Sequence, residues 1–185
     1  MPRQKVSQKL VFDTAEQISK DIGLAALNLK HIADRLNIKP PSLYKHIKNI
    51  EQISDELALR GYTGIIGKVQ EVTVGVSGEI ALLEFARAYR KFATMNPSLY
   101  EAMQPTHVNR ITDIQARADQ LLNIIFKILQ PFKLKNNKIH AVRALRSYID
   151  GFVRIEILGG FGMDENVDAS FDYGIRLWLK GIQAK

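Results

Sequence analysis

The sequence predicts an all-α protein of nine helices. Apolar residues recur three or four positions apart along almost the whole chain, which places them on one face of an α-helix. Helix-ending residues such as Gly23 and Pro131 separate these stripes. Residues 70–79, QEVTVGVSGE, are rich in β-branched residues and glycine. We interpret them as a loop or a frayed helix end, with a short strand as the alternative.

Four helices are expected in the first 71 residues. The first carries apolar residues from Leu10 to Ile22 and ends at Gly23. Two short helices follow, at about 29–36 and 40–47, and a longer one spans about 49–71.

Five more helices are expected after residue 78. The second of them is a short piece that follows Asn96–Pro97, and GGFG at 159–162 forms the turn before the last. In order, the five segments span about 79–94, 96–105, 108–129, 137–158 and 165–183.

The positive charge of the chain is concentrated near its N-terminus. The 185 residues have a net charge of +7, of which residues 1–48 carry +5. A concentrated positive charge favours a polyanion as partner, although a merely solvated surface would explain it as well.

Several classes of protein are disfavoured. The absence of cysteine removes disulfides and thiolate metal sites and fits a cytoplasmic location. The N-terminus is polar and no run of about 18 apolar residues occurs, so we expect neither a secretory signal nor a membrane span. The four histidines are isolated from one another, and the common hydrolase and phosphate-loop motifs are missing. We therefore expect no enzyme, no metal site and no cofactor.

Two consecutive prolines interrupt a helical pattern in the stretch IADRLNIKPPSLYKHI, residues 32–47. Asn28 can cap the helix before them, because its side-chain oxygen can accept a first-turn N–H. Asn37 can end that helix, because asparagine tolerates a positive φ. Pro40 and Pro41 then occupy the first turn of the next helix, where a missing N–H costs nothing. The interruption is therefore a tight turn between two short helices.

Two short helices joined by a tight turn, in the most basic part of the chain, form a helix-turn-helix pattern. An ordinary helical hairpin is the alternative. The second helix would enter the DNA major groove, with its prolines facing thymine methyl groups and its polar side chains reaching phosphates and base edges. Leu43 and Ile47, one helical turn apart, should be core. The candidate DNA contacts are Asn28, Lys30, Lys39, Pro40, Pro41, Ser42, Tyr44, Lys45, His46 and Lys48.

Residues 27–53, LNLKHIADRLNIKPPSLYKHIKNIEQI, resemble the DNA-binding segment of TetR-family transcriptional regulators. The resemblance covers about residues 5–70 and rests on Ile32–Ala33, Asn37, the run Leu43–Ile47 and Glu51. The sequence departs from the family at Asn37, where glycine is usual, and at Ile47, where phenylalanine is usual. The double proline replaces more polar residues, so no base preference is carried over.

The C-terminal part resembles one TetR subgroup, whose eighth helix bears a Trp…His-Gly signature. The similar segments are YIDGFVRIEILGGF and SFDYGIRLWLKGI, although Arg146 and Asp150 stand where that subgroup favours Trp and His. The resemblance implies a helix-turn-helix domain at residues 1–48 and an effector-binding and dimerisation domain at 49–185. It also implies a homodimer joined by a four-helix interface of the last two helices, and a ligand cavity within helices four to eight.

The residues of the last two helices agree with dimerisation. Gly151 lies in mid-helix, where glycine costs about 1 kcal/mol relative to alanine, and a close helix crossing would explain that cost. The final helix is expected to expose Phe171, Trp178 and Leu179, more large apolar residues than a small domain easily covers. A two-fold dimer would bury them and place two recognition helices roughly 34–36 Å apart; packing within one chain is the alternative. The candidate interface residues are Ile149, Gly151, Val153, Ile157, Phe171, Ile175, Trp178 and Leu179.

Aromatic and methionine side chains crowd the middle of the chain and would suit a pocket for an apolar or aromatic molecule. The alternative is that each of these side chains packs in the ordinary hydrophobic core and lines no pocket. The candidate ligand-binding residues are Phe85, Tyr89, Phe92, Met95, Tyr100, Met103, Phe126 and Phe152.

The sequence thus predicts a ligand-responsive DNA-binding transcriptional regulator, most simply a repressor that binds a palindromic operator as a homodimer. Its expected partners are double-stranded DNA, a second copy of the chain and an unidentified small effector. A helical protein–protein adaptor without specific DNA binding is the alternative, and an architectural DNA binder without an effector is a third reading.

Overall fold

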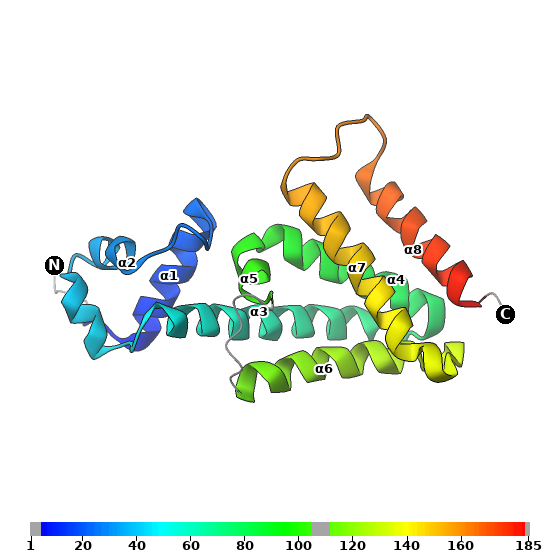
Figure 1. The fold of residues 1–185 in the computed structure, drawn as a ribbon, viewed down its shortest axis with the longest axis horizontal. Coiled ribbons are helices and arrows are strands. Elements are labelled where there is room, and N and C mark those ends of the chain that lie inside the picture. Colours follow the sequence, from blue (N-terminus) through cyan, green and yellow to red (C-terminus); the bar gives the residue numbers. More distant parts are fainter. Residues whose placement is uncertain (1–4, 105–111, 184–185) are drawn as a thin grey trace. The chain divides into compact units, whose positions relative to one another are not determined.

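The computed structural model describes residues 5–104 and 112–183, and within them the fold is entirely helical (Figure 1). The α-helices are α1 (Gln8–Ile22), α2 (Leu29–Arg35), α3 (Ile50–Thr73), α4 (Gly78–Met95), α5 (Pro97–Ala102), α6 (Thr112–Ile128), α7 (Lys138–Ile157) and α8 (Val167–Gln183). Three 3-10 segments are η1 (Pro40–Lys45), η2 (Gln130–Phe132) and η3 (Lys135–Asn137). The predicted all-α fold class is therefore confirmed.

The described α-helices and η1 together make up the nine helices that the sequence predicts, and the differences lie at their ends. α3 continues to Thr73 and α4 begins at Gly78, so the β-branched stretch is a helix end followed by a loop at 74–77. Part of the helix expected at 108–129, and the end of the short piece at Pro105, lie outside the described residues.

The chain divides into two compact units. Unit 1 comprises Met1–Thr63 and Asn96–Arg117, and unit 2 comprises Gly64–Met95 and Ala118–Lys185. Helix α3 contributes its N-terminal half to unit 1 and its C-terminal half to unit 2. The boundary at residue 48 between the expected domains stays a prediction.

Unit 1 has a small core beneath the turn between α2 and η1. Helix α1 packs on α2 and on α5, and α2 packs on η1. Each buried aliphatic side chain contributes about 1.5–3 kcal/mol, so this core can hold a segment as short as η1 in place. Its fully buried side chains include Val11, Ala15, Ile32, Ala33, Leu43, Ile53 and Leu57, from α1, α2, η1 and α3.

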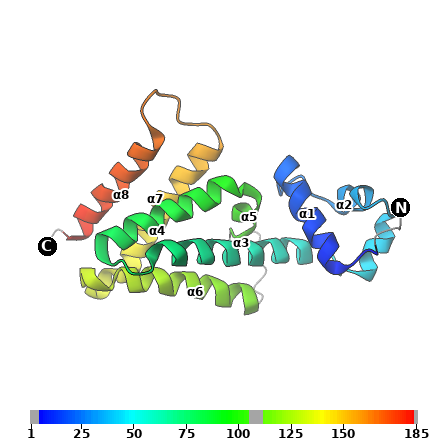
Figure 2. The same ribbon diagram turned by 180° about the vertical axis from the view of Figure 1, so that it is seen from behind.

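In unit 2, α4 packs against both helices of the hairpin formed by α7 and α8, as the views from the two sides agree (Figures 1 and 2). The C-terminal half of α3 lies close to α4, where a Cβ atom at Gly64 would stand 2.6 Å from Cε2 of Phe92. The most deeply buried side chains of this unit are Ile65, Leu82, Phe85, Leu145, Val153, Phe171 and Ile175. None of the described helices is both long and apolar enough to cross a membrane.

Candidate nucleic-acid interface and ion-pair network

The turn between α2 and η1 has the local geometry that the sequence predicts. The side chain of Asn28 accepts a hydrogen bond from the backbone N–H of His31, at 3.1 Å, and so caps α2. Asn37 has a φ of 52°, and the N–H of Ile38 donates to the carbonyl of Ala33 at 3.0 Å. Lys39 is extended. The two helical segments therefore meet in a tight, hydrogen-bonded turn.

The second helix of the motif is a six-residue 3-10 segment rather than an α-helix. Prolines at both of its first two positions leave few N–H donors. The bonds that remain span three residues: the N–H of Ser42 donates to the carbonyl of Lys39, and that of His46 to the carbonyl of Leu43, each at 2.8 Å. Leu43 and Ile47 are buried, as predicted, and fix the segment against the core.

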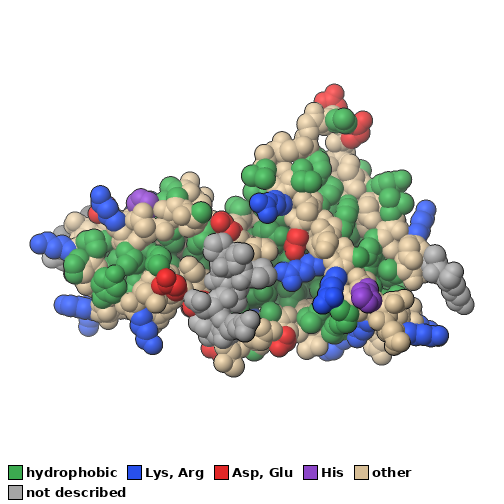
Figure 3. All heavy atoms as spheres, viewed as in Figure 1, with side chains coloured by type: hydrophobic (Ala, Val, Ile, Leu, Met, Phe, Trp, Pro, Cys, Tyr) green, Lys and Arg blue, Asp and Glu red, His purple; other side chains and the backbone are tan. Residues whose placement is uncertain are grey.

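Because Leu43 and Ile47 point inward, the other side chains of η1 point to solvent. Tyr44 is 59% exposed. In Figure 3, lysine and arginine side chains project from the surface around the N-terminal end of the chain. Of the ten predicted DNA contacts, Ser42 and His46 are half-buried and the other eight are exposed, namely Asn28, Lys30, Lys39, Pro40, Pro41, Tyr44, Lys45 and Lys48.

The start of α3 carries a cap that the sequence analysis missed. Asn49 accepts a hydrogen bond from the N–H of Gln52 at 3.0 Å, and the Gln52 side chain accepts one from the N–H of Lys48 at 2.7 Å. This pattern is a variant of the capping box: asparagine replaces Ser or Thr, and Gln52 binds the N–H one residue before the cap. This cap holds the backbone of Lys48, shortly after the end of η1. An asparagine just before a stripe of apolar residues is a sequence signal that could have revealed the cap.

A half-buried arginine, Arg60, joins α1 to α3 within unit 1. Nη1 of Arg60 lies 2.8 Å from Asp13 and 2.9 Å from Glu16, and its Nε lies 2.9 Å from Glu56. The i to i+4 spacing of Glu56 and Arg60 is visible in the sequence, but the two partners on α1 are more than 40 residues away. The sequence analysis did not identify this cluster.

These contacts shift the ionisation of the cluster. Lys9 and Arg60 lower the pKa of Asp13 below its usual value. Burial by itself would raise the pKa of Glu16, but hydrogen bonds from Lys20 and Arg60 lower it on balance. Likewise, burial opposes the charged form of Arg60, yet its three carboxylate partners raise its pKa. Asp13, Glu16 and Arg60 are therefore charged at neutral pH.

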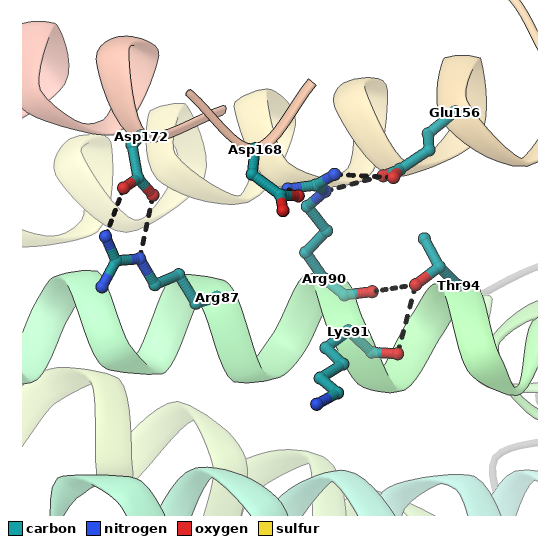
Figure 4. Close-up of a pocket in the computed structure, with 7 residues that line it drawn as sticks. All are labelled: Arg87, Arg90, Lys91, Thr94, Glu156, Asp168 and Asp172. Atoms are coloured by element: carbon teal, nitrogen blue, oxygen red, sulfur yellow. Dashed lines mark hydrogen bonds and ion pairs between the residues drawn. The ribbon is translucent and has the colours of Figure 1, made fainter. Parts of the chain in front are cut away.

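Two arginines of α4 hold the α7–α8 hairpin in unit 2 (Figure 4). Arg90, only 11% exposed, donates to both carboxylate oxygens of Glu156 on α7, at 2.7 and 2.6 Å, and contacts Asp168 on α8 at 2.8 Å. Its guanidinium also lies over the rings of Phe152 and Phe171, 5.2 and 5.0 Å from their centres. Arg90 therefore contacts both α7 and α8, in each case through an ion pair and a cation–π contact.

Arg87, one turn earlier, forms a two-pronged pair with Asp172 on α8 and a further pair with Glu84. Arg87 lowers the pKa of Asp172, and Glu156 raises the pKa of Arg90. Figure 4 shows both arginines reaching toward the hairpin, whereas Lys91 points away from these carboxylates. The seven residues drawn there line a surface hollow of about 540 Å³, within which the arginines are matched by carboxylates.

The eight predicted ligand-binding residues do not gather at one described site. Phe85, Tyr89, Phe92 and Phe152 are buried in unit 2, whereas Tyr100 and Met103 are buried in unit 1. Met95 is 68% exposed, and Phe126 lies under the ammonium of Lys138, 3.9 Å from its ring centre. None of the eight lines the hollow of Figure 4 or the second hollow described below.

The expectation that the last helix leaves Phe171 and Leu179 uncovered is wrong. Both are buried within a single chain, because α8 turns this face toward α4 and α7. Ile149, Val153 and Ile175 of the predicted interface are buried in the same way. Gly151 and Ile157 are exposed and Trp178 is half-buried. The alternative of packing within one chain thus applies to five of the eight residues.

The helical fold and the tight turn between α2 and η1 are those of a helix-turn-helix protein. A sequence model described as Tetracyclin repressor-like, C-terminal domain, matches residues 82–177. The transcriptional regulator YobS of Bacillus subtilis (strain 168) is 32% identical over 183 residues, which cover 98% of this chain and 95% of YobS. The chain therefore belongs to the TetR family of transcriptional regulators.

One further relative agrees with this assignment, and a solved structure shares the fold. The regulator Rv0681 of Mycobacterium tuberculosis (strain ATCC 25618 / H37Rv) is 26% identical over 176 residues, covering 94% of this chain and 80% of that protein. A solved structure of a protein from Rhodococcus sp. RHA1 superposes over the full length of both chains with a TM-score of 0.82 at 14% identity. At that identity the likeness concerns the fold alone.

Proposed function

We propose that this chain is a ligand-responsive repressor that binds a palindromic operator as a homodimer and is released by a small apolar or aromatic effector. The observation that carries the proposal is the exposure of side chains in and beside η1. Leu43 and Ile47 are buried, and Lys39, Tyr44 and Lys45 face solvent. Membership of the TetR family supports the same reading.

DNA recognition would use the unusual start of η1. Exposed Pro40 and Pro41 offer apolar surface rather than N–H donors, which suits thymine methyl groups better than phosphates. Lys39, Lys45 and Lys48 supply the charge that neutralises phosphates and makes affinity depend on salt. Tyr44 adds a hydroxyl that can reach the DNA backbone.

Dimerisation would use the exposed faces of α7 and α8. Exposed apolar side chains on these helices include Ile155, Leu158, Tyr173 and Leu177, and space around Gly151 is open. Together with Ile157 and Trp178 from the predicted set, they provide an apolar surface of the kind that a second copy would cover.

Effector response would act through α3, since this helix contributes to both units. An effector must bind one conformation of the dimer better than the other, because equal affinity for both shifts nothing. The aromatic residues of unit 2, with Phe85 and Phe152 among them, support an apolar or aromatic ligand. We also infer that the chain acts in the cytoplasm, has no enzymatic activity and belongs to the subgroup with the Trp…His-Gly signature.

The experiment is selection of sequences from a random DNA pool by the purified protein at about 0.15 M salt, the range in which phosphate contacts are strongly screened. Recovery of a palindrome supports a dimeric, specific regulator. If a folded, effector-free protein recovers no motif, the repressor proposal fails and the adaptor reading replaces it. Affinity that does not change with salt would also contradict DNA binding.

A further inference from the structure

A second surface hollow, of about 550 Å³, lies where three helices of unit 2 end or begin. The C-terminus of α3, the loop 74–77, the start of α4 and the last turns of α6 surround it. Its walls are largely apolar, with Val74 and Val76 at an exposed edge and Ala81, Ile124 and Ile128 deeper. A volume of this size is typical of sites for small organic molecules.

One cation lines this hollow and no acidic residue does. Lys127 is exposed in the last turn of α6, and it has no ion pair with any described residue. The two acidic residues beside the lining stretch 70–81 do not line the hollow: Glu71 pairs with Lys68 at 3.0 Å, and Glu79 accepts a hydrogen bond from Gln183 at 2.7 Å. From residue 120 to residue 149 the sequence has six lysines and arginines and no acidic residue. The local potential therefore favours an anion.

The two hollows of unit 2 differ in whether their cationic side chains already have carboxylate partners. In the hollow of Figure 4, three lining carboxylates pair with Arg87 and Arg90, and Glu84 pairs with Arg87 as well, so an incoming anion would have to displace one of them. In the second hollow, Lys127 has no such competitor, and the hydroxyl of Ser77 has no described partner. Apolar walls with a single uncompensated cation fit a molecule that has an apolar body and one negative charge.

We propose that this hollow binds a small amphipathic carboxylic acid. Its apolar body would lie against Ala81, Ile124 and Ile128, and its carboxylate would pair with the Lys127 ammonium and accept a hydrogen bond from Ser77. This inference rests on the proposed effector response and narrows the effector to an apolar organic anion. Because α3, α4 and α6 meet at the hollow, a bound acid would stabilise one arrangement of these helix ends.

The test uses the full-length protein and four probes: octanoate, 4-phenylbutyrate, butyrate and octan-1-ol. Binding is followed by the methyl NMR resonances of Ile124 and Ile128. We expect saturable shifts with octanoate or 4-phenylbutyrate, and the stronger of the two tells whether an aliphatic or an aromatic acid is preferred. Butyrate, with four fewer methylene groups than octanoate, should bind at least about tenfold more weakly.

The charge is tested by Lys127→Met, which keeps the apolar stem of the side chain. It should weaken octanoate about three- to fivefold and leave octan-1-ol unchanged. Lys91→Met, which removes a charge from the other hollow, is the matched control and should not alter octanoate binding. Absence of saturable shifts, or equal effects of Lys127→Met on the acid and the alcohol, would overturn the proposal.

The selection of DNA sequences described above separates this inference from the proposed function. Octanoate binding by a protein that recovers no DNA motif would support the site and contradict the repressor. A recovered palindrome without binding of either acid would support the repressor and contradict the proposed site.

Discussion

Arg60 on α3 reaches Glu16 on α1 with a guanidinium–carboxylate distance of 2.9 Å, within a cluster that also holds Asp13 and Glu56. The side chain of Arg60 is 24% exposed, so the cluster is partly shielded from water. The cluster joins α1 to α3, the helix that contributes to both units.

Removing this arginine should destabilise the protein. In Arg60→Gln, three carboxylates lose their shared cation, and we expect a loss of about 2 kcal/mol in the free energy of unfolding, less than for a fully buried pair because water screens the site. Chemical denaturation of the folded variant measures this loss. Arg35→Gln, which removes the exposed partner of Asp21, is the control and should change stability by less than about 0.5 kcal/mol.

The same cluster predicts a pH dependence. The folded-state pKa values of Asp13 and Glu16 are lowered, so their contribution to stability is fully present above the unfolded-state values of about 4. It is lost as pH falls through the lowered values. Denaturation between about pH 6 and pH 2 should therefore show stability falling with acid, and Asp13→Asn should reduce that slope. An unchanged slope in this variant would contradict the assignment.

Gly174 of α8 is expected to tolerate no side chain. A Cβ atom there would lie 2.1 Å from the hydroxyl oxygen of Tyr148, and the ring atoms behind it are also too close. Gly174→Ala should therefore destabilise unit 2 by about 1–3 kcal/mol, as other overpacked sites do. Gly181→Ala, on the same helix with open space around it, should be neutral or stabilising by up to about 1 kcal/mol. Thermal unfolding compares the two, and similar values would contradict this packing.

DNA binding should depend on side chains of η1 that support no core. Tyr44→Ala and Lys45→Ala remove exposed groups, so each should weaken operator binding by about 1–2 kcal/mol without lowering the unfolding temperature. Lys45→Ala should also make the salt dependence of affinity less steep. The control is Lys20→Ala on α1. Unchanged affinity in both variants would show that other residues contact the DNA.

Self-association should depend on the exposed face of α8. Leu177 is 50% exposed, and Leu177→Glu places a charge where a second copy would cover it. We expect the variant to sediment as a monomer at micromolar concentration while keeping its helical content. Ile80→Glu, at a residue of α4 that is 63% exposed, is the control. A Leu177→Glu protein that remains dimeric would exclude this face of α8 as the dimer interface.

Short-range chemistry explains why the recognition motif was predictable. Asn28, Asn37 and the two prolines act on backbone groups within a few residues of themselves, so their effects can be read along the chain. The type of the second helix was less predictable, because the 3-10 form depends on how Leu43 anchors a six-residue segment.

Long-range contacts explain what was missed. Helical spacing places the apolar side chains of Phe171 and Leu179 on one face of α8. It does not tell whether α4 or a second chain covers that face. Arg90 and Glu156 are 66 residues apart, and nothing local to either indicates the other. The hollow beside Lys127 is formed by two stretches that are distant in the sequence, residues 70–81 and 124–128.

By itself the sequence determined the helices, the turn of the DNA-binding motif and the family, because periodicity and capping are local properties of the chain. The folded structure was needed to show which face of α8 is buried, which carboxylates hold Arg60 and Arg90, and that Lys127 lines a hollow without acidic residues. The reason is physical: burial and charge pairing depend on groups brought together through space, and their energies are set by neighbours that the order of residues does not specify.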